Sequence, residues 1–180
     1  MRIVGGKYRG KKLIGPENMA VRPTSDRARE AIFNILYSAI GGVQDKKVLD
    51  VFAGTGALGF EALSRGAQSV CFIDKETKSV LKNMALFDAD KDKIKVIRSD
   101  VNGLKIRADA FDLIFSDAPY DKGLNEKAFE ALVQNELILD GAMCVVETRH
   151  NEVLNLLSNF ELINTRIYGM AKIWFYVFHL

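Results

Sequence analysis

The sequence contains few of the residues that build disulfide frameworks and metal sites. Its 180 residues include two cysteines, two histidines, three prolines and one tryptophan. Cys71 and Cys144 lie far apart, each within an apolar run, and are expected to be buried thiols. They are too few for a disulfide framework or a zinc site. His150 and His179 are equally isolated, so we expect no metal ion in this protein.

Long hydrophobic runs are missing as well. No stretch of about eighteen apolar residues occurs, although 48% of the residues are hydrophobic. The first seven residues, MRIVGGK, have no apolar core of the length that a signal peptide needs. The charged content of 27% is typical of a globular protein, and the length fits one compact unit. These features predict a cytoplasmic protein with no membrane partner.

Positive charge is concentrated near the amino terminus. Residues 1–29 hold eight basic and two acidic side chains, whereas the whole chain has a net charge of only +2, so the remainder is acidic. A basic arm on a mildly acidic body indicates a polyanionic partner whose phosphates the arm contacts. On charge alone, a solvated surface hairpin would look the same.

Short apolar runs alternate with helical stretches from residue 46 onward. The runs predicted to be buried parallel strands are Val48–Phe52, Ser69–Asp74, Ile94–Arg98, Phe111–Ser116 and Met143–Glu147. The predicted helices are Ala57–Arg65, Thr77–Phe87 and Leu124–Asn135. Two further β-rich runs, Phe160–Ile167 and Ile173–Phe178, predict a terminal antiparallel hairpin. The alternation indicates an α/β fold with a mostly parallel sheet and helices on both faces.

An extension, residues 1–42, is predicted ahead of this sheet domain of residues 43–180. Arg2–Val4 and Lys11–Ile14 flank a glycine-bearing turn and predict a β-hairpin. The segment Thr24-Ser25-Asp26 precedes an apolar helical pattern that ends near Gly41-Gly42, which predicts a capped amphipathic helix.

The first core strand leads into a glycine-rich loop. Gly54, Gly56 and Gly59 match the pattern G-x-G-x-x-G, between a predicted strand and a predicted helix. Asp74 follows Gly54 by about twenty residues, the spacing of an acid that binds ribose hydroxyls. The loop therefore predicts a nucleotide-like ligand at the carboxyl ends of the strands.

Two cofactor classes could use this loop. A dinucleotide needs an open helix N-terminus for its pyrophosphate. S-adenosylmethionine (SAM) has no phosphate. It carries a sulfonium and an ammonium group, and these positive charges favour a nearby carboxylate. Asp50 lies within the strand, where a charge without such a partner is costly, so it favours SAM. A carboxylate that caps loop amides is the alternative for Asp50, and Asp100 either reaches the adenine amine or is a solvated acid. The predicted cofactor-binding residues are Asp50, Ala53, Gly54, Thr55, Gly56, Asp74 and Asp100.

The fourth core strand ends in the tetrapeptide Asp117-Ala118-Pro119-Tyr120. It resembles the D/N-P-P-Y/F signature of enzymes that methylate exocyclic amines of adenine or guanine. Such an amine is a poor nucleophile because its lone pair is conjugated into the ring, and two acceptors near its N–H groups can free that lone pair. The Asp117 carboxylate and the Ala118 carbonyl are the predicted acceptors, and Tyr120 is the predicted stacking face. Ala118 replaces the family's usual proline but keeps the carbonyl, and Pro119 biases it away from the helical region.

The chain as a whole is similar to the RsmD family of bacterial 16S rRNA (guanine-N2)-methyltransferases, named for position 966 of that rRNA. The similarity runs in order through residues 5–13, 22–36, 50–59 and 117–120. It implies a Rossmann-like sheet of seven strands with the last one antiparallel, SAM as cofactor, and a target guanine in the assembling or assembled small subunit. The expected RNA contacts are Lys7, Arg9, Lys11, Lys12, Arg22 and Arg27. In the family's pattern, Arg22, Thr24 and Arg27 can instead close over the cofactor.

Three other functions stay open at this point. An NAD-dependent oxidoreductase would explain the glycine loop but neither the tetrapeptide nor the basic arm. A non-catalytic RNA-binding module would not need Asp117 and Tyr120. A methyltransferase acting on adenine-N6, or on another nucleic-acid amine, would use the same tetrapeptide, so the residues alone do not separate guanine from adenine.

Overall fold

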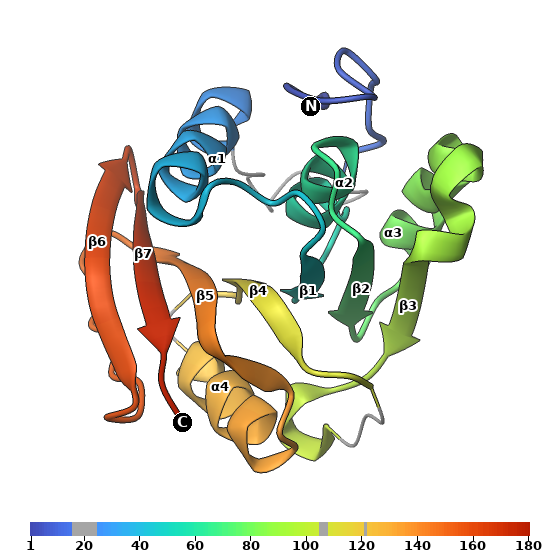
Figure 1. The fold of residues 1–180 in the computed structure, drawn as a ribbon. Coiled ribbons are helices and arrows are strands. Elements are labelled where there is room, and N and C mark those ends of the chain that lie inside the picture. Colours follow the sequence, from blue (N-terminus) through green and yellow to red (C-terminus); the bar gives the residue numbers. More distant parts are fainter. Residues whose placement is uncertain (16–24, 105–107, 121) are drawn as a thin grey trace.

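A seven-stranded sheet forms the middle layer of the protein (Figure 1). The computed structural model describes residues 1–15, 25–104, 108–120 and 122–180, so the predicted RNA contact Arg22, with Thr24, lies outside the described residues. The strands are β1 (Lys47–Val51), β2 (Ser69–Asp74), β3 (Ile94–Arg98), β4 (Phe111–Asp117), β5 (Ile138–Arg149), β6 (Phe160–Tyr168) and β7 (Ala171–Phe178).

The strand order confirms the predicted α/β topology. Across the sheet it is β3-β2-β1-β4-β5-β7-β6. The first five of these strands pair in parallel, and β7 pairs antiparallel with both β5 and β6. The order reverses between β1 and β4, and in an open α/β sheet the ligand site lies at such a switch point, beyond the carboxyl ends of the strands.

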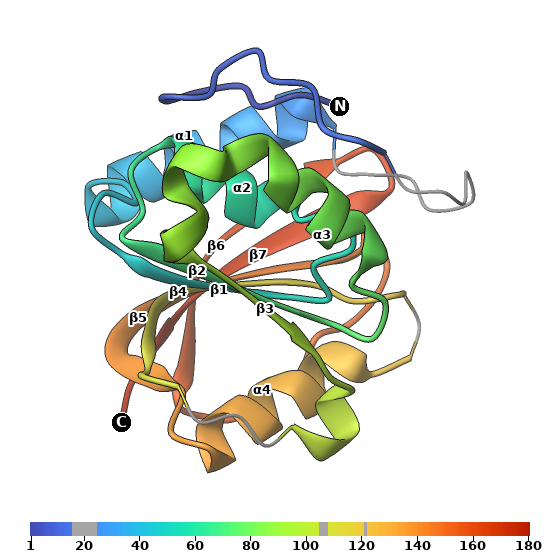
Figure 2. The ribbon, with the colours of Figure 1, turned by 90° about the vertical axis from the view of Figure 1, so that its right-hand side faces the viewer.

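Helices cover both faces of the sheet (Figure 2). On one face lie α1 (Asp26–Ile40), α2 (Ala57–Ser64) and α3 (Lys78–Met84), which continues into the 3₁₀ segment η1 (Ala85–Lys93). On the other lie α4 (Leu124–Gln134) and the short η2 (Val101–Gly103). Each face has its own apolar core, because successive residues such as Val48 and Leu49 of β1 point to opposite sides and both are fully buried.

The predicted amino-terminal helix is confirmed with its caps. The Ser25 hydroxyl accepts a hydrogen bond from the Ala28 N–H at 3.1 Å, and Gly41 closes the helix in the left-handed region. Ahead of it, the predicted hairpin is a short antiparallel contact. One bridge joins Arg2 to Lys12, and the Ile3 N–H donates to the Lys11 carbonyl at 2.9 Å.

The helix predicted over Thr77–Phe87 ends earlier than expected. The α-helical part is Lys78–Met84, and the backbone of Phe87 is not helical, with φ −121° and ψ 39°. The reason is packing, since the Phe87 ring is fully buried and stacks on Phe60 with the ring centroids 4.5 Å apart.

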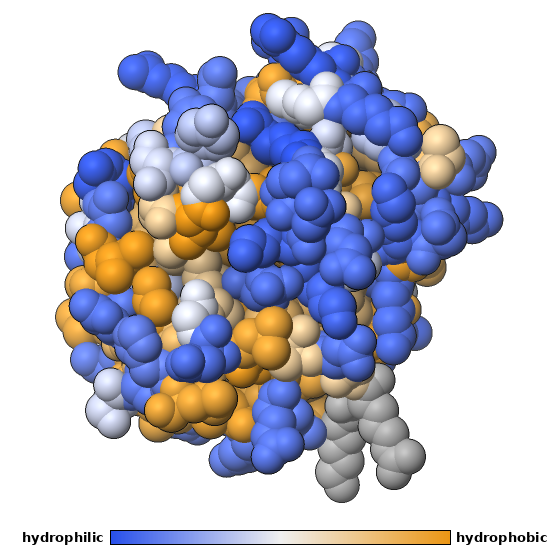
Figure 3. Space-filling view, viewed as in Figure 1, coloured by the Kyte–Doolittle hydropathy of each residue, from blue (hydrophilic) through white to orange (hydrophobic). Residues whose placement is uncertain are grey.

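The surface seen in the view of Figure 1 is divided by polarity. Figure 3 shows hydrophilic residues over the side of the amino-terminal segment and α3, and apolar residues among polar ones on the side of β6 and β7. The exposed apolar residues of β6 are Leu162, Ile163 and Ile167. Among the described residues, no helix combines the length and apolar character that crossing a bilayer demands.

Candidate active site

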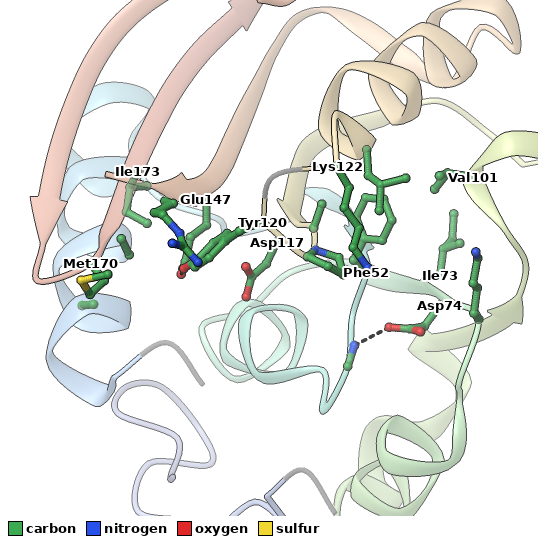
Figure 4. Close-up of a pocket in the computed structure, with 18 of the residues that line it drawn as sticks. Phe52, Ile73, Asp74, Val101, Asp117, Tyr120, Lys122, Glu147, Met170 and Ile173 are labelled. Carbon is green, nitrogen blue, oxygen red and sulfur yellow. Dashed lines mark hydrogen bonds between the residues drawn. The ribbon is translucent and has the colours of Figure 1, made fainter. Parts of the chain in front are cut away.

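A cavity of about 790 Å³ lies at the carboxyl ends of the parallel strands, where the topology predicts a site. Its walls come from the end of β2, the residues that follow β1, β2 and β3, the ends of β4 and β5, the start of α1, and the turn between β6 and β7 with the start of β7. In Figure 4, Phe52, Ile73, Asp74 and Val101 line one half, and Tyr120, Glu147 and Ile173 line the other. Asp117 lies between the two halves.

The first half joins a carboxylate to apolar walls. Asp74 ends β2, and its carboxylate accepts hydrogen bonds from the Gly54 N–H at 2.7 Å and the Glu76 N–H at 2.9 Å (Figure 4). Phe52 stands directly after β1 with φ +59°, a strained conformation for a residue with a side chain, and its ring faces the cavity. The Asp74 carboxylate is therefore fixed by backbone amides at the edge of an apolar slot.

Two of the loop glycines are required by close packing. A Cβ at Gly59 would lie 2.3 Å from the Phe72 ring, and one at Gly56 would lie 2.6 Å from the Phe60 ring. Gly54 differs, because it has φ +55° but a Cβ added there would meet no atom nearer than 4.0 Å. Gly56 and Gly59 thus let α2 pack against β2, and Gly54 turns the chain at the cavity.

Asp50 lies beneath the loop. It is 2% exposed, and its carboxylate accepts a hydrogen bond from the Gly59 N–H at 2.9 Å. Burial raises the pKa of Asp50 to about 8, with a further contribution from the charge of Asp74. Of the predicted cofactor residues, Gly54, Asp74 and Asp100 line the cavity, whereas Asp50, Ala53, Thr55 and Gly56 do not. The Asp50 carboxylate thus binds a backbone amide, which is the alternative role that the sequence left open for it.

Asp100 lines the same half of the cavity, close to a lysine. Its carboxylate forms a 2.7 Å ion pair with the Lys75 ammonium, and both side chains are substantially exposed. An exposed pair of this kind contributes little to stability. Asp100 is thus placed to contact a ligand, and its role as a cofactor contact stays a prediction.

The second half holds the tetrapeptide, and all four of its residues line the cavity. Asp117 is the last residue of β4, and its partner in register on the parallel strand β5 is Glu147. The Tyr120 hydroxyl donates a hydrogen bond to the Glu147 carboxylate at 2.8 Å, and the Arg149 guanidinium lies 5.7 Å from the centre of the Tyr120 ring. Asp117 and Tyr120 therefore face one cavity, and their catalytic roles stay predictions.

A buried amide holds the ends of β4 and β5 together. Asn125, near the start of α4, accepts a hydrogen bond from the Ser116 hydroxyl at 2.7 Å and donates one to the Glu147 carbonyl at 3.3 Å. Ser116 and Asn125 are both almost fully buried. Ser116 precedes Asp117 in the chain, and Asn125 is bonded to Glu147. The network therefore fixes the spacing between Asp117 and Glu147.

The Asp117 carboxyl is unusually basic. Burial raises the pKa of Asp117 well above its ordinary value, and the charges of Glu147 and Asp50 raise it further. Burial and the Glu147 carboxylate also raise the pKa of the Tyr120 hydroxyl, so the phenol stays a donor. A cation or a group rich in N–H donors would stabilise the ionised form of Asp117.

The predicted RNA contacts of the basic arm divide into two sets, although Ser25 and Ala28, on either side of Arg27, line the cavity. Lys7 forms a 2.9 Å ion pair with Asp90, and the Lys11 ammonium donates to the Leu86 carbonyl at 2.5 Å, so both are engaged with η1. Arg9 and Lys12 are exposed, as is Arg27 on α1. The prediction that all of these residues contact RNA stays a prediction. Arg9, Lys12 and Arg27 are better placed for it, because Lys7 is exposed but paired with Asp90 and Lys11 is bonded to Leu86.

Glu147 and Phe52 line the cavity but were not among the predicted site residues. Glu147 was assigned only to a strand. A carboxylate at the carboxyl end of a parallel strand is itself a signal for a site, and that signal could have identified it. Phe52 carried no such signal, because its φ of +59° is visible only in the folded chain.

Known proteins match this chain along almost its whole length. The family model described as "Conserved hypothetical protein 95" matches residues 1–177. Ribosomal RNA small subunit methyltransferase D of Escherichia coli (strain K12) is 34% identical over 176 residues, which cover 95% of this chain and 86% of that protein. The protein of the same name from Haemophilus influenzae is 35% identical over 178 residues, covering 96% and 91%.

Solved structures of methyltransferases are similar in fold to this chain. A putative methyltransferase, yhhF, from Escherichia coli has a TM-score of 0.85 and 33% identity, covering 99% of this chain and 98% of its own. The N-methyltransferase NodS from Bradyrhizobium japonicum, solved in complex with S-adenosyl-L-homocysteine, has a TM-score of 0.65 over 86% of this chain and 88% of its own. At 12% identity, NodS shares the fold alone.

Proposed function

This chain belongs to the RsmD family, and from that membership we infer that it transfers a methyl group from SAM to the exocyclic N2 amine of a guanine in 16S rRNA. The inference rests on one observation above all. The tetrapeptide that ends β4 and the Asp74 carboxylate that ends β2 face the same cavity. A group bound at Asp74 and a base bound at Asp117 would therefore be neighbours.

The residues around Asp74 fit SAM. The Asp74 carboxylate is positioned to accept hydrogen bonds from ribose hydroxyls, and Phe52, Ile73 and Val101 offer apolar walls of the kind that an adenine ring requires. The carboxylates of Asp74 and Asp100 line this half of the cavity, and negative charge there favours a sulfonium and an ammonium over a pyrophosphate, which argues against NAD. When bound, SAM supplies the electrophilic methyl group.

The tetrapeptide would prepare the base. A guanine stacked on Tyr120 would present its N2 amine to the Asp117 carboxylate and the Ala118 carbonyl. Two acceptors draw the N–H groups out of the ring plane and return the lone pair to the nitrogen, and the remaining requirement is alignment of nitrogen, methyl and sulfur. Asp117 is suited to this because it ends a strand that Asn125 and Ser116 hold in place.

The arm would bind the RNA. Arg9 and Lys12 are exposed near the amino terminus, where they can contact phosphates without disturbing the core. Such contacts position the protein on the RNA and do not select the base. The partner that we propose is the small ribosomal subunit, during or after assembly, in the cytoplasm.

The proposed function is tested by mapping the methylated nucleotide. Small subunits from cells that lack this protein are incubated with the purified protein and SAM carrying a labelled methyl group, and the rRNA is digested and analysed by mass spectrometry. We expect one N2-methylguanosine in 16S rRNA that is absent from untreated subunits. Methylation of an adenine instead, or binding of NAD without binding of SAM in calorimetry, would overturn the proposal.

A further inference from the structure

We propose that Glu147 is the residue that selects guanine, by accepting a hydrogen bond from the ring N1–H while Asp117 and the Ala118 carbonyl hold the adjacent N2 amine. This inference rests on the proposed function, since it concerns the same cavity. It goes further by explaining the choice between guanine and adenine, which the tetrapeptide leaves open.

The first support is the position of the two carboxylates. Asp117 and Glu147 are partners in register on neighbouring parallel strands, so their side chains leave the sheet on the same side at the same edge. Both line the cavity, and each is near enough for the Glu147 charge to raise the pKa of Asp117. A base held at Asp117 therefore has Glu147 beside it (Figure 4).

The second support is that Glu147 is held in place. Its side chain accepts the Tyr120 hydroxyl at 2.8 Å, and its backbone carbonyl accepts the Asn125 amide at 3.3 Å. The residue is only 6% exposed. A carboxylate has two oxygens and about four acceptor positions, so a donor from the cavity can join the contacts that Glu147 already makes. Glu147 is thus a fixed acceptor that meets the base on which Tyr120 stacks.

The third support is the match to guanine. Asp117, Ala118 and Glu147 all line the cavity, and their carboxylate and carbonyl groups are acceptors. Among the bases with an exocyclic amine, guanine alone has a ring N–H next to the amine. Adenine and cytosine have a ring nitrogen with a lone pair there, which would face the Glu147 carboxylate without a proton between them. A polar site that is matched to one donor pattern rejects a ligand that lacks the donor, because its own groups lose their partner.

The test reverses the donor pattern next to the N2 amine of the base. Small subunits are reconstituted with 16S rRNA in which the methylated guanosine has been replaced, by ligation, with 2,6-diaminopurine riboside. This base keeps the N2 amine, but its N1 is an acceptor and an amine replaces the O6 carbonyl. The wild-type protein is expected to methylate guanine at least ~10-fold faster than diaminopurine, the discrimination of one well-placed base contact. Equal rates on the two subunits would overturn the inference without any variant.

The variant Glu147→Gln assigns that preference to the side chain. Glutamine keeps the length, and its amide oxygen can still accept the Tyr120 hydroxyl, while its NH₂ group donates to the N1 of diaminopurine and opposes the N1–H of guanine. The guanine-to-diaminopurine rate ratio is expected to fall by at least ~10-fold. The control Glu130→Gln, on an exposed position of α4, should leave the ratio at its wild-type value.

The outcomes separate this inference from the proposed function. If Glu147 only supports Tyr120, Glu147→Gln slows both substrates by the same factor and the ratio stays unchanged, which refutes selection by Glu147. In that case the wild-type protein still methylates guanine, and the proposed function stands. If the wild-type protein methylates no guanine in these subunits, the proposed function itself fails.

Discussion

The side-chain amide of Asn83 donates a hydrogen bond to the carbonyl of Thr55 at 2.9 Å and so ties α3 to the glycine loop. The same side chain pairs with the backbone of Ile14, accepting its N–H at 2.7 Å and donating to its carbonyl at 3.0 Å. Asn83 is fully buried, in contrast to most asparagines. One amide therefore joins the amino-terminal segment to the loop that borders the cavity.

Replacing Asn83 should weaken both the fold and the cofactor loop. Asn83→Ala leaves the N–H and carbonyl of Ile14 and the carbonyl of Thr55 without their partner, which should lower the free energy of unfolding by about 1–3 kcal/mol or more. Urea denaturation measures this loss, and calorimetry should show weaker SAM binding. The control Asn34→Ala, at an exposed position of α1, should change neither quantity appreciably. Unchanged SAM affinity in Asn83→Ala would show that the link to the loop is only structural.

The packing of the glycine loop gives a prediction about Gly59. Gly59→Ala would place a Cβ against the Phe72 ring, and overpacking of this kind costs about 1–3 kcal/mol. Gly103→Ala is the matched control, because no atom lies within 4 Å of its Cβ position. Thermal melting compares the two. If both variants melt at the same temperature, then Gly59 is not needed for packing of α2 on β2.

Much of this fold could be predicted from the sequence. Ser69–Asp74 and Ile94–Arg98 are strands with the expected limits, because each is an apolar run between polar turns. The start of β5 was missed, since Asp140 and Gly141 are exposed residues that do not resemble a buried strand. The break near Phe87 depends on stacking against Phe60, which no local pattern contains.

The site was predictable where one motif carries it. Asp74 and Asp117 end β2 and β4 in recognisable patterns, and both line the cavity. The pairing of Asp117 with Glu147 was not predictable, because it depends on β4 and β5 being neighbours in register. The engagement of Lys7 by Asp90 was also hidden, since the two residues are 83 positions apart.

The basic arm should bind RNA mainly through its exposed residues. Arg9→Ala and Lys12→Ala should each weaken binding to small-subunit rRNA whatever its sequence, and each should reduce the slope of log K against log salt by about 0.7–0.9. Titrations at several salt concentrations give this slope. Lys127→Ala, on the opposite face of the sheet, is the control. A slope unchanged in the double variant Arg9→Ala/Lys12→Ala would exclude these two residues as phosphate contacts.

The pKa of Asp50 makes stability depend on pH. Its folded-state pKa of about 8 is above the ordinary value of 3.8, so the folded protein binds a proton that the unfolded chain has lost. The contribution to stability is complete below pH 3.8 and falls by ~1.4 kcal/mol per pH unit as pH rises toward 8. Asp50→Asn should reduce this slope by about that amount, since an amide keeps the bond from Gly59. The free energy of unfolding is measured from denaturation curves at several pH values between 5 and about 8. If it falls with pH equally steeply in the wild-type protein and in Asp50→Asn, the raised pKa is contradicted.

The central claim is that Asp117 acts on the target amine, and its most direct test is the methylation rate of Asp117→Ala beside Asp117→Asn. Because Asp117 ends a strand at the cavity, replacing it should leave folding and SAM affinity nearly intact. Asp117→Ala should methylate small subunits ~10²–10³-fold more slowly, the loss expected for a preorganised electrostatic group. Asp117→Asn should lose less, since an amide oxygen still accepts a hydrogen bond. Methylation by Asp117→Ala at the wild-type rate would contradict the account and make the tetrapeptide a turn with no part in catalysis.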